Sequence, residues 1–294
     1  MNLSNTYNRE RLVFMKKIKS GKTREIYDLG EELLIVFLDK ISTLDFVFTE
    51  IIPQKGIISN KLTEFWYKKT ESIIPNYMIS AKDVDMPKEF RQERYIGRCM
   101  VVKKNITVIP VGGCVRGYAT GYVWDARNNG SIFELEIPKG MEESEKFPSP
   151  IYTGTTRNTA YHDKRISFEQ TVERVGLQLA NQIRSKSLEL YAFCSEYALK
   201  KGVIIADTKF KFGVDSNNKL VLIDQVITPD TSRFWLKENY ITGKPQVCSY
   251  DKQELLEELK RIGWRPHSPM PKLTQKEIKD VSAKYNKIYE LLIK

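Results

Sequence analysis

The chain has 294 residues, of which 41% are hydrophobic, 11% aromatic and 29% charged, and its formal charge is +10. This composition indicates a globular protein of one or two domains and excludes a chain that is disordered throughout. The longest apolar run, residues 33–38, is far shorter than the ~20 residues that cross a bilayer, so no membrane span is expected. The positive charge favours anionic partners: nucleic acid, phosphorylated metabolites or acidic membrane surfaces.

Cysteine and histidine usage limits the metal chemistry and the compartment. The four cysteines show no metal-binding spacing, and two histidines are too few for a multi-histidine site. Residues 1–19 are polar and basic, without the apolar segment of a secretion signal. We therefore expect reduced thiols and a cytoplasmic protein.

The first hundred residues are predicted to form short strands around one helix. A turn followed by a strand is expected over residues 21–28, and apolar strands are expected over 32–38 and 98–102. Ser59 is the expected N-cap of the helix, whose apolar face includes Trp66.

The middle of the chain changes from strands to a helix. Residues 108–111 and 114–118 are expected as two strands that flank a glycine pair, and the short gaps between strands favour antiparallel pairing. Residues 133–163 contain three prolines, which predicts a long loop that is functional or mobile. Ser167, with the glutamine three residues later, forms a capping box, and one helix is expected to run from there to about Gly202.

A hairpin and helices are predicted for the last third. Strands over residues 203–214 and 220–226 are joined by a turn at 215–218, and the chain from Gln253 onward is expected to be helical with breaks at prolines. The predicted fold is α+β, and its two lobes are residues 1–108 and 109–294.

A glycine turn near the N-terminus carries two basic residues. Gly21-Lys22-Thr23 has the letters of a P-loop, but Lys16 stands where the first P-loop glycine belongs, and an extended segment follows where a helix is needed. A P-loop is therefore excluded. A turn with Lys22 and Arg24 can still cover phosphates; the alternative is a hairpin whose charges are solvated.

Charged side chains gather on one face of the predicted hairpin. Because strand side chains alternate, Asp207, Lys209 and Lys211 share one face. If the residues that flank the four-residue turn pair with each other, Asp224 lies opposite Lys209 and diagonal to Lys211. Such a face can hold a metal–phosphate group, or its charges can simply neutralise one another.

Two other segments contain candidate anion-binding groups. Arg116 lies among glycines, where the backbone can approach a ligand. The turn after the hairpin exposes Asp230, Ser232 and Arg233, and its hydroxyl and guanidinium donors suit an anion. Each arginine also has a purely structural interpretation. One pair in the predicted loop is either an acid–base pair or a clasp of that loop: His162 and Asp163.

Taken together, five segments resemble the phosphoribosylaminoimidazole-succinocarboxamide (SAICAR) synthetase family in order and spacing over nearly the whole chain. They are residues 21–27, 39–45, 115–118, 204–210 and 222–235. The resemblance implies a small mostly antiparallel, kinase-like lobe and a larger ATP-grasp-like lobe with ATP between them. It also implies an ATP-dependent ligase with Mg²⁺ that joins carboxyaminoimidazole ribotide to aspartate.

The resemblance also implies roles for individual residues. The groups around the ATP phosphates are Gly21, Lys22, Arg24, Lys209 and Asp224, the last of which is also the implied magnesium ligand. The groups that hold the ribotide phosphate are Arg116, Ser232 and Arg233. The residues at the reaction centre are Asp207, Lys209, Lys211 and Asp230. Further substrate contacts are Asp45, Tyr122, His162 and Asp163.

The chain departs from the family pattern at several of these positions. Lys211 stands where the family has a glutamate that binds magnesium, and a protonated lysine cannot bind a metal. Gln225 replaces a glutamate, Tyr122 replaces a serine, and Lys40 replaces an arginine. The loop over residues 153–163 lacks the proline and glutamate of the family and is about one residue short.

These departures lead to a hypothesis and leave alternatives open. Lys211 would replace a metal-held carboxylate by a fixed cation near Asp224, so that fewer metal ions bind. The alternatives are a paralogue that couples a different acid and amine, a relative that binds nucleotide without catalysis, and a nucleic-acid-binding protein. The expected partners are ATP, an anionic ribotide and an amino acid, without nucleic acid or membrane, and a homo-oligomer stays open.

Overall fold

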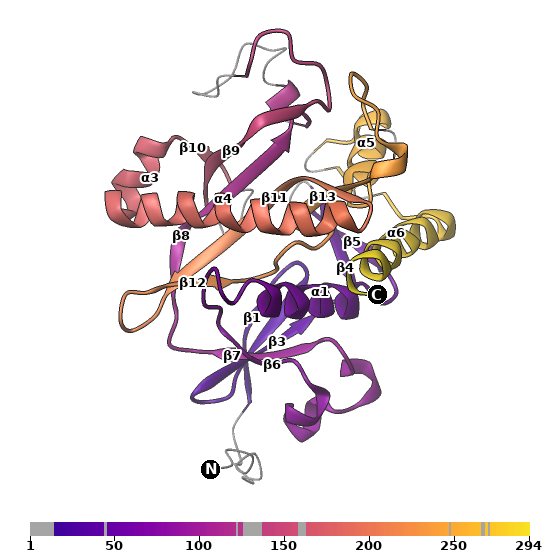
Figure 1. Ribbon diagram of the computed structural model, residues 1–294. Coiled ribbons are helices and arrows are strands. Elements are labelled where there is room, and N and C mark those ends of the chain that lie inside the picture. The colour runs from indigo at the N-terminus through magenta and orange to yellow at the C-terminus, as the bar shows by residue number, and fades with distance from the viewer. Residues whose placement is uncertain are drawn as a thin grey trace.

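In its described residues, the computed structural model has two larger antiparallel sheets, a separate two-stranded hairpin and five α-helices of at least eight residues (Figure 1). It describes residues 15–43, 46–121, 123–125, 137–157, 163–246, 248–265, 268–269 and 271–294. Asp45, Tyr122 and His162, three of the predicted substrate contacts, lie outside the described residues. Within the described part, no helix is both long and apolar enough to pass through a bilayer.

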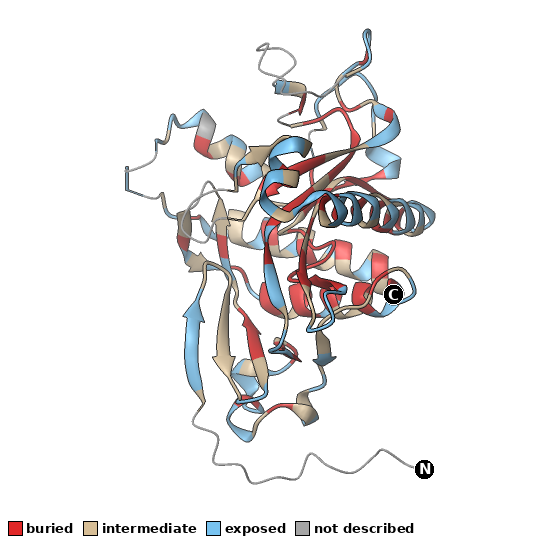
Figure 2. Ribbon diagram, turned by 90° about the vertical axis from the view of Figure 1, so that its left-hand side faces the viewer, coloured by how far each residue is buried: buried red, intermediate tan, exposed pale blue. Residues whose placement is uncertain are grey.

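The first sheet has five strands in the order β1-β2-β3-β7-β6. Their bounds are Lys16–Ser20, Arg24–Asp28, Glu32–Phe37, Cys99–Lys103 and Met78–Ser80. The central strand β3 is the most apolar, and its last four residues are buried. β1 is the outer edge, and all of its residues are exposed (Figure 2). The predicted strands of this region are confirmed, including their antiparallel pairing.

A hairpin and a helix follow the third strand. The hairpin consists of β4 (Lys40–Thr43) and β5 (Phe46–Ile51), and α1 spans Lys55–Lys69. The prediction of Ser59 as N-cap is wrong, because the helix begins one turn earlier. Gln54 is the N-cap, with φ 65°, and the Asp39 carboxylate accepts the Gly56 N–H at 2.8 Å. A cap from a residue this distant in sequence leaves no local signal.

The second sheet has the order β10-β9-β8-β11-β12, and β13 pairs with the other end of β11. These strands are Arg165–Ile166, Lys146–Thr156, Thr107–Tyr118, Val203–Val214, Leu220–Ile223 and Ser232–Leu236. Short 3₁₀ helices lie at Asp83–Asp85, Lys88–Phe90, Glu93–Tyr95 and Lys237–Asn239.

Two predictions for this sheet are wrong. β8 is one strand and continues through its glycine pair, because α4 lies so close that a Cβ on Gly113 would be 2.5 Å from Ser187 Oγ. Part of the predicted loop is the strand β9. Its prolines, Pro148 and Pro150, lie where the register with β8 shifts, which is where a sheet tolerates residues without an N–H.

The helices cover this sheet and join the two halves of the molecule. α3 (Phe168–Val175) begins with the predicted capping box at Ser167. The expected single helix is interrupted at Gly176, with φ 80°, before α4 (Leu177–Lys200) packs across β8, β9 and β11. α5 spans Gln253–Arg261, and α6 spans Gln275–Ile293 and packs against α1 (Figure 1).

The register of the hairpin β11–β12 differs from the prediction by one residue. Val214 pairs with Leu220, because the Asp215 carboxylate accepts the N–H groups of Asn217 and Lys219 and enlarges the loop. β12 ends at Ile223, and Asp224 leaves the strand with φ 71°. Its carboxylate therefore still reaches Lys211 of the neighbouring strand.

One hydrophobic core extends through both sheets. The same cluster contains Phe37 of β3, Trp66 of α1, Phe210 of β11 and Tyr285 of α6 (Figure 2). The sheets change between Lys103 and Thr107, close to the boundary that the sequence predicts near residue 108. The division into two lobes stays a proposal, since their cores are continuous.

Candidate active site

A cavity of about 500 Å³ lies between the glycine turn of the first sheet and the hairpin of the second. Its volume is in the range of ligand pockets in proteins. Seven of its lining side chains are basic and four are acidic. The basic residues are Lys19, Lys22, Arg24, Arg157, Lys209, Lys211 and Lys252, and the acidic residues are Asp163, Asp224, Asp230 and Asp251. The excess of positive charge fits an anionic ligand.

The turn between β1 and β2 forms one wall of this cavity. The Gly21 N–H donates to the carbonyl of Arg24 at 2.8 Å, which closes the turn. Gly21, Lys22 and Arg24 all line the cavity, as do Lys209 and Asp224. The predicted ATP-binding residues thus come together from two distant parts of the chain.

Asp224 is the most strongly paired carboxylate in the cavity. Arg24 binds both of its oxygens, with Nη2 at 2.6 Å from Oδ2, and Lys211 Nζ lies 3.0 Å from Oδ2. Burial opposes ionisation of Asp224, but Arg24 and Lys211 hold its pKa well below the usual value. Its backbone is fixed as well, because Tyr67 Oη donates to its carbonyl at 2.6 Å.

Other basic side chains line the cavity together with Asp224 and its two partners. Lys209 forms an ion pair with Asp163, at the end of the segment where the sequence places an acid–base pair or a clasp. Arg157, at the end of β9, lines the cavity, and burial lowers its pKa, since its charge is poorly solvated. Asp224 raises the pKa of Lys211, yet burial and the charges of Arg24 and Lys209 outweigh this and lower it.

The two predicted phosphate-binding arginines meet at one carboxylate. Asp207 pairs across the sheet with Arg116 of β8 and with Arg233 of β13, so three neighbouring strands present these side chains together. Both guanidinium groups lie 3.0 Å from Asp207 Oδ2. Ser232 Oγ is 2.7 Å from Thr208 Oγ1 on the other face of the strand. Arg116 and Arg233 thus form a rigid, doubly charged pair beside the cavity.

Asp230 is held by three side chains from three elements. Lys55 of α1 pairs with its Oδ2, Tyr285 of α6 donates to its Oδ1 at 3.2 Å, and Lys252 lies 3.4 Å from Oδ1. Burial would raise the pKa of Asp230, but Lys55 and Lys252 lower it to about 2.

Several site residues are absent from the sequence prediction. Lys55 had one available signal: a lysine in the first turn of a helix opposes the helix dipole and needs another reason to be there. No sequence motif marks three further residues of the site. Arg157 directly follows β9, and Asp251 and Lys252 directly precede α5. Tyr285 has the spacing of an ordinary core position in α6, so only the fold reveals its polar contact.

The described residues do not form a preformed magnesium site. Among them, no group of three or more His, Cys, Asp or Glu side chains is placed to hold a metal. Asp224, the predicted ligand, has its oxygens in ion pairs with Arg24 and Lys211. Mg²⁺ prefers one or two carboxylates together with substrate phosphates, and this set offers one carboxylate that two cations already neutralise.

These features define an α+β protein with a cationic cavity between its two larger sheets. The family model of SAICAR synthetase matches residues 17–271. The phosphoribosylaminoimidazole-succinocarboxamide synthase of Lachnospira eligens is 42% identical, over 92% of this chain and 93% of the relative, and that of Pelobacter propionicus is 41% identical over 92% of each. A structure of SAICAR synthase from Saccharomyces cerevisiae in complex with SAICAR superposes with a TM-score of 0.83, at 35% identity and 98% coverage of both chains.

The chain therefore belongs to the SAICAR synthetase family. This confirms the resemblance carried by the five sequence segments and the predicted α+β fold.

Proposed function

We propose that this protein is an ATP-dependent ligase that joins carboxyaminoimidazole ribotide to L-aspartate and yields SAICAR, ADP and phosphate in purine biosynthesis. The observation that carries the proposal is the match to named SAICAR synthases over more than nine-tenths of the chain. The cationic cleft supports it, because two of the three substrates carry phosphate groups.

The chemistry needs an activated carboxyl group, since a carboxylate is a poor acyl donor. An oxygen of the ribotide carboxylate attacks the γ-phosphorus of ATP, the bond to the β-phosphate oxygen breaks, and ADP leaves. The aspartate amine then attacks the acyl carbon, loses a proton and displaces inorganic phosphate. Both steps move negative charge, so fixed cations around the reacting atoms lower the barrier.

We assign the nucleotide to the wall formed by the glycine turn. Lys22 and Arg24 bind its phosphates there, and Lys209 and Lys211 face them from β11. Because Arg24 and Lys211 hold Asp224 in the ligand-free arrangement, phosphates compete with this carboxylate for both cations. Asp224 thereby holds both cations in place, while the cavity as a whole keeps an excess of positive charge for ATP.

We assign the ribotide phosphate to Arg116 and Arg233; the family resemblance adds Ser232, whose hydroxyl contacts Thr208 in this structure. Asp207 fixes both guanidinium groups, so that they keep their geometry while a dianion binds. Asp230, with Asp163, lies at the cavity wall near the acyl group and the aspartate. Asp45, Tyr122 and His162 keep the substrate contacts that the family resemblance gives them.

For magnesium we propose that the ion enters with ATP and is not held by a protein cage. When bound to the triphosphate, Mg²⁺ neutralises part of its charge. Lys211 supplies a second, fixed positive charge at 3.0 Å from Asp224. We place the reaction in the cytoplasm, in agreement with four cysteines that are all free thiols.

The direct test is an assay with ATP, the imidazole ribotide and a panel of amines, followed by mass spectrometry of the products. We expect SAICAR from aspartate, with one ADP for each amide formed. Efficient turnover of another acid or amine in its place would establish a paralogue. Tight ADP binding without any amide product would establish a non-catalytic relative, and salt-dependent DNA retention that ATP does not change would favour a nucleic-acid-binding protein.

A further inference from the structure

A buried ion pair joins a residue of the cavity wall to a residue behind it. Lys55, the first residue of α1, is 1% exposed, and its ammonium group pairs with Asp230. Tyr285, fully buried on α6, donates to the other oxygen of the same carboxylate at 3.2 Å. Asp230 lines the cavity, whereas Lys55 and Tyr285 reach it only through Asp230.

Stability alone does not explain this lysine. Removing an ammonium group from water costs several kcal/mol, and apolar residues of similar volume often replace a buried ion pair at no loss. Lys55 also lies in the first turn of α1, where the helix dipole disfavours a cation and the helix itself contributes no acidic residue. A lysine in such a place indicates that the ionised carboxylate it holds is needed.

A second cation contacts the same carboxylate from the cavity side. Lys252 Nζ is 3.4 Å from Asp230 Oδ1, and its side chain is 24% exposed. Because Lys55 neutralises Asp230 from inside the protein, Lys252 is not required for that purpose. Its charge is available to an anionic group in the cavity, such as a substrate carboxylate or an acyl phosphate.

We propose that Lys55 is a positioning residue: together with Tyr285 it fixes the carboxylate of Asp230 at the cavity wall, so that Lys252 faces the reacting anion. The inference rests on the proposed ligase function and assigns to it a buried residue that touches no substrate. It also gives α6, the last helix of the chain, a part in shaping the site.

The charged groups around Asp230 determine how the network responds to pH. Lys55 faces it from α1, Tyr285 from α6 and Lys252 from the segment before α5. Two further carboxylates act on its partners: Asp39 on Lys55 and Asp251 on Tyr285. Without Lys55, the effect of burial is less compensated, so the pKa of Asp230 is expected to rise.

The test compares Lys55→Met with Lys55→Arg and with the wild type. Lys55→Met is expected to lower kcat about ten- to a hundredfold, to change the KM for ATP by less than about twofold, and to move the acid limb of kcat to higher pH. Lys55→Arg keeps the charge and is expected to restore most of kcat and the acid limb. The matched control is Lys284→Met, which removes an ion pair between α6 and Glu254 of α5; neither residue lines the cavity.

A double-mutant cycle isolates the route of the effect. If Lys55 acts through Asp230, Lys55→Met causes little further loss in an Asp230→Asn background. Equal losses in both backgrounds, or a Lys55→Met enzyme with wild-type kcat and pH profile, would overturn the proposal. If Lys55→Met does not fold, the test uses Tyr285→Phe. We expect this variant to lose kcat a few-fold and to show the same shift of the acid limb. An unchanged pH profile of kcat for Tyr285→Phe overturns the proposal. A wild type that forms no SAICAR contradicts the proposed function instead.

Discussion

Asp224, just after β12, forms ion pairs with two cations from different strands, Arg24 of β2 and Lys211 of β11. Arg24 and Lys211 both neutralise this carboxylate, and the pKa of Asp224 is held well below its usual value as a result. A dication would have to displace at least one of the two cations to bind there. The charge of the cavity is therefore built mainly from lysine and arginine.

Substitution of Lys211 tests whether its charge replaces a metal ion. At constant MgATP, we expect the wild-type rate to stay flat as free Mg²⁺ rises, because the second positive charge is fixed. Lys211→Glu places a second carboxylate beside Asp224 and is expected to create a dependence on free Mg²⁺. Lys211→Met is the control that removes the charge without adding a ligand. Initial rates over a series of free Mg²⁺ concentrations decide; a saturable rise for the wild type would refute the idea, because it would show that a second metal ion binds.

Because the pKa of Asp230 is low in the folded protein, we expect the protein to lose stability in acid. Its pKa is about 2 in the folded protein and about 4 in an unfolded chain. The folded state therefore gains stability above pH ~4 and loses it as the pH falls toward 2, by about 2 kcal/mol. Urea unfolding at several pH values measures this, and the acid loss should be smaller for Asp230→Asn. Asp28→Asn, at an exposed pair with Lys104, serves as the control and should change the pH dependence little.

The sequence predicts on which face of a strand each side chain lies, but it does not predict which side chains of other strands it meets. Alternation placed Asp207, Lys209 and Lys211 on one face correctly, since it depends only on the strand. The meeting of Arg116 and Arg233 at Asp207 depends on strand order, which spacing does not encode. The contact of Lys211 with Asp224 was expected on a wrong register and exists because Asp224 turns out of the strand.

Among the elements, β8 shows how a strand is shaped by the helix above it. Tyr191 of α4 donates to the carbonyl of Ile205 at 2.6 Å, and its ring lies where a Cβ on Gly117 would be. The sequence pattern predicts a break only at the glycine pair 112–113 and keeps Gly117 inside a strand. In the structure Gly113 and Gly117 are the places where a helix approaches the sheet most closely, so the strand continues.

Gly117→Ala should therefore destabilise the protein by about 2 to 3 kcal/mol, because Tyr191 has to move from its hydrogen bond. Gly140→Ala is the matched control: its φ is 85°, but nothing lies within 4 Å of the added atom, so about 1 kcal/mol of backbone strain is expected. Denaturant midpoints of both variants measure the difference. Equal midpoints would show that β8 and α4 separate without cost.

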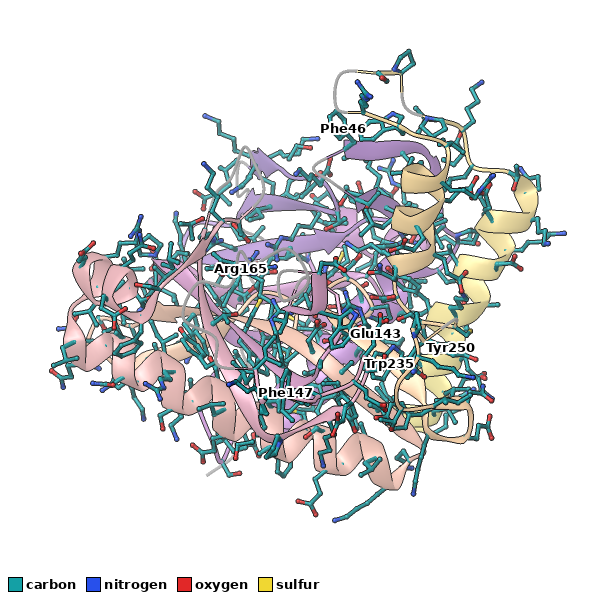
Figure 3. The ribbon with its side chains drawn as sticks, turned by 90° about the horizontal axis from the view of Figure 1, so that it is seen from above. Phe46, Glu143, Phe147, Arg165, Trp235 and Tyr250 are labelled. Carbon is teal, nitrogen blue, oxygen red and sulfur yellow. The ribbon has the colours of Figure 1, made fainter. Side chains whose placement is uncertain are left out.

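For the whole molecule, the cavity lies between segments of both sheets, while one core connects them. The sheets change between Lys103 and Thr107, near the boundary that the sequence predicts, but sequence reasoning did not foresee that α6 returns to pack on α1. Phe46 of the hairpin (labelled in Figure 3) likewise packs edge-on against Trp264, with ring centres 4.7 Å apart. Such long-range contacts join the N-terminal hairpin to the C-terminal helices.

Nucleotide binding across this cavity should stabilise the molecule as one unit. ADP at about 100 times its Kd adds about 2.7 kcal/mol to the free energy of unfolding, which raises Tm by about 4 °C for a chain of 294 residues. Adenosine at the same concentration is the control, and it should raise Tm far less, because the cavity recognises phosphates through its basic side chains. Differential scanning calorimetry should show one transition that shifts as a whole; a shift of only part of the transition would contradict a common core.

The edge strand β1 carries a different consequence. Its outer N–H and C=O groups pair with no strand of the described chain, and such an edge can recruit another molecule into an intermolecular sheet. Three of its five residues are lysines: Lys16, Lys17 and Lys19. Their positive charges repel the same edge of a second molecule. Acetylation or neutral replacement of these lysines would remove this repulsion and make β1 a site of aggregation.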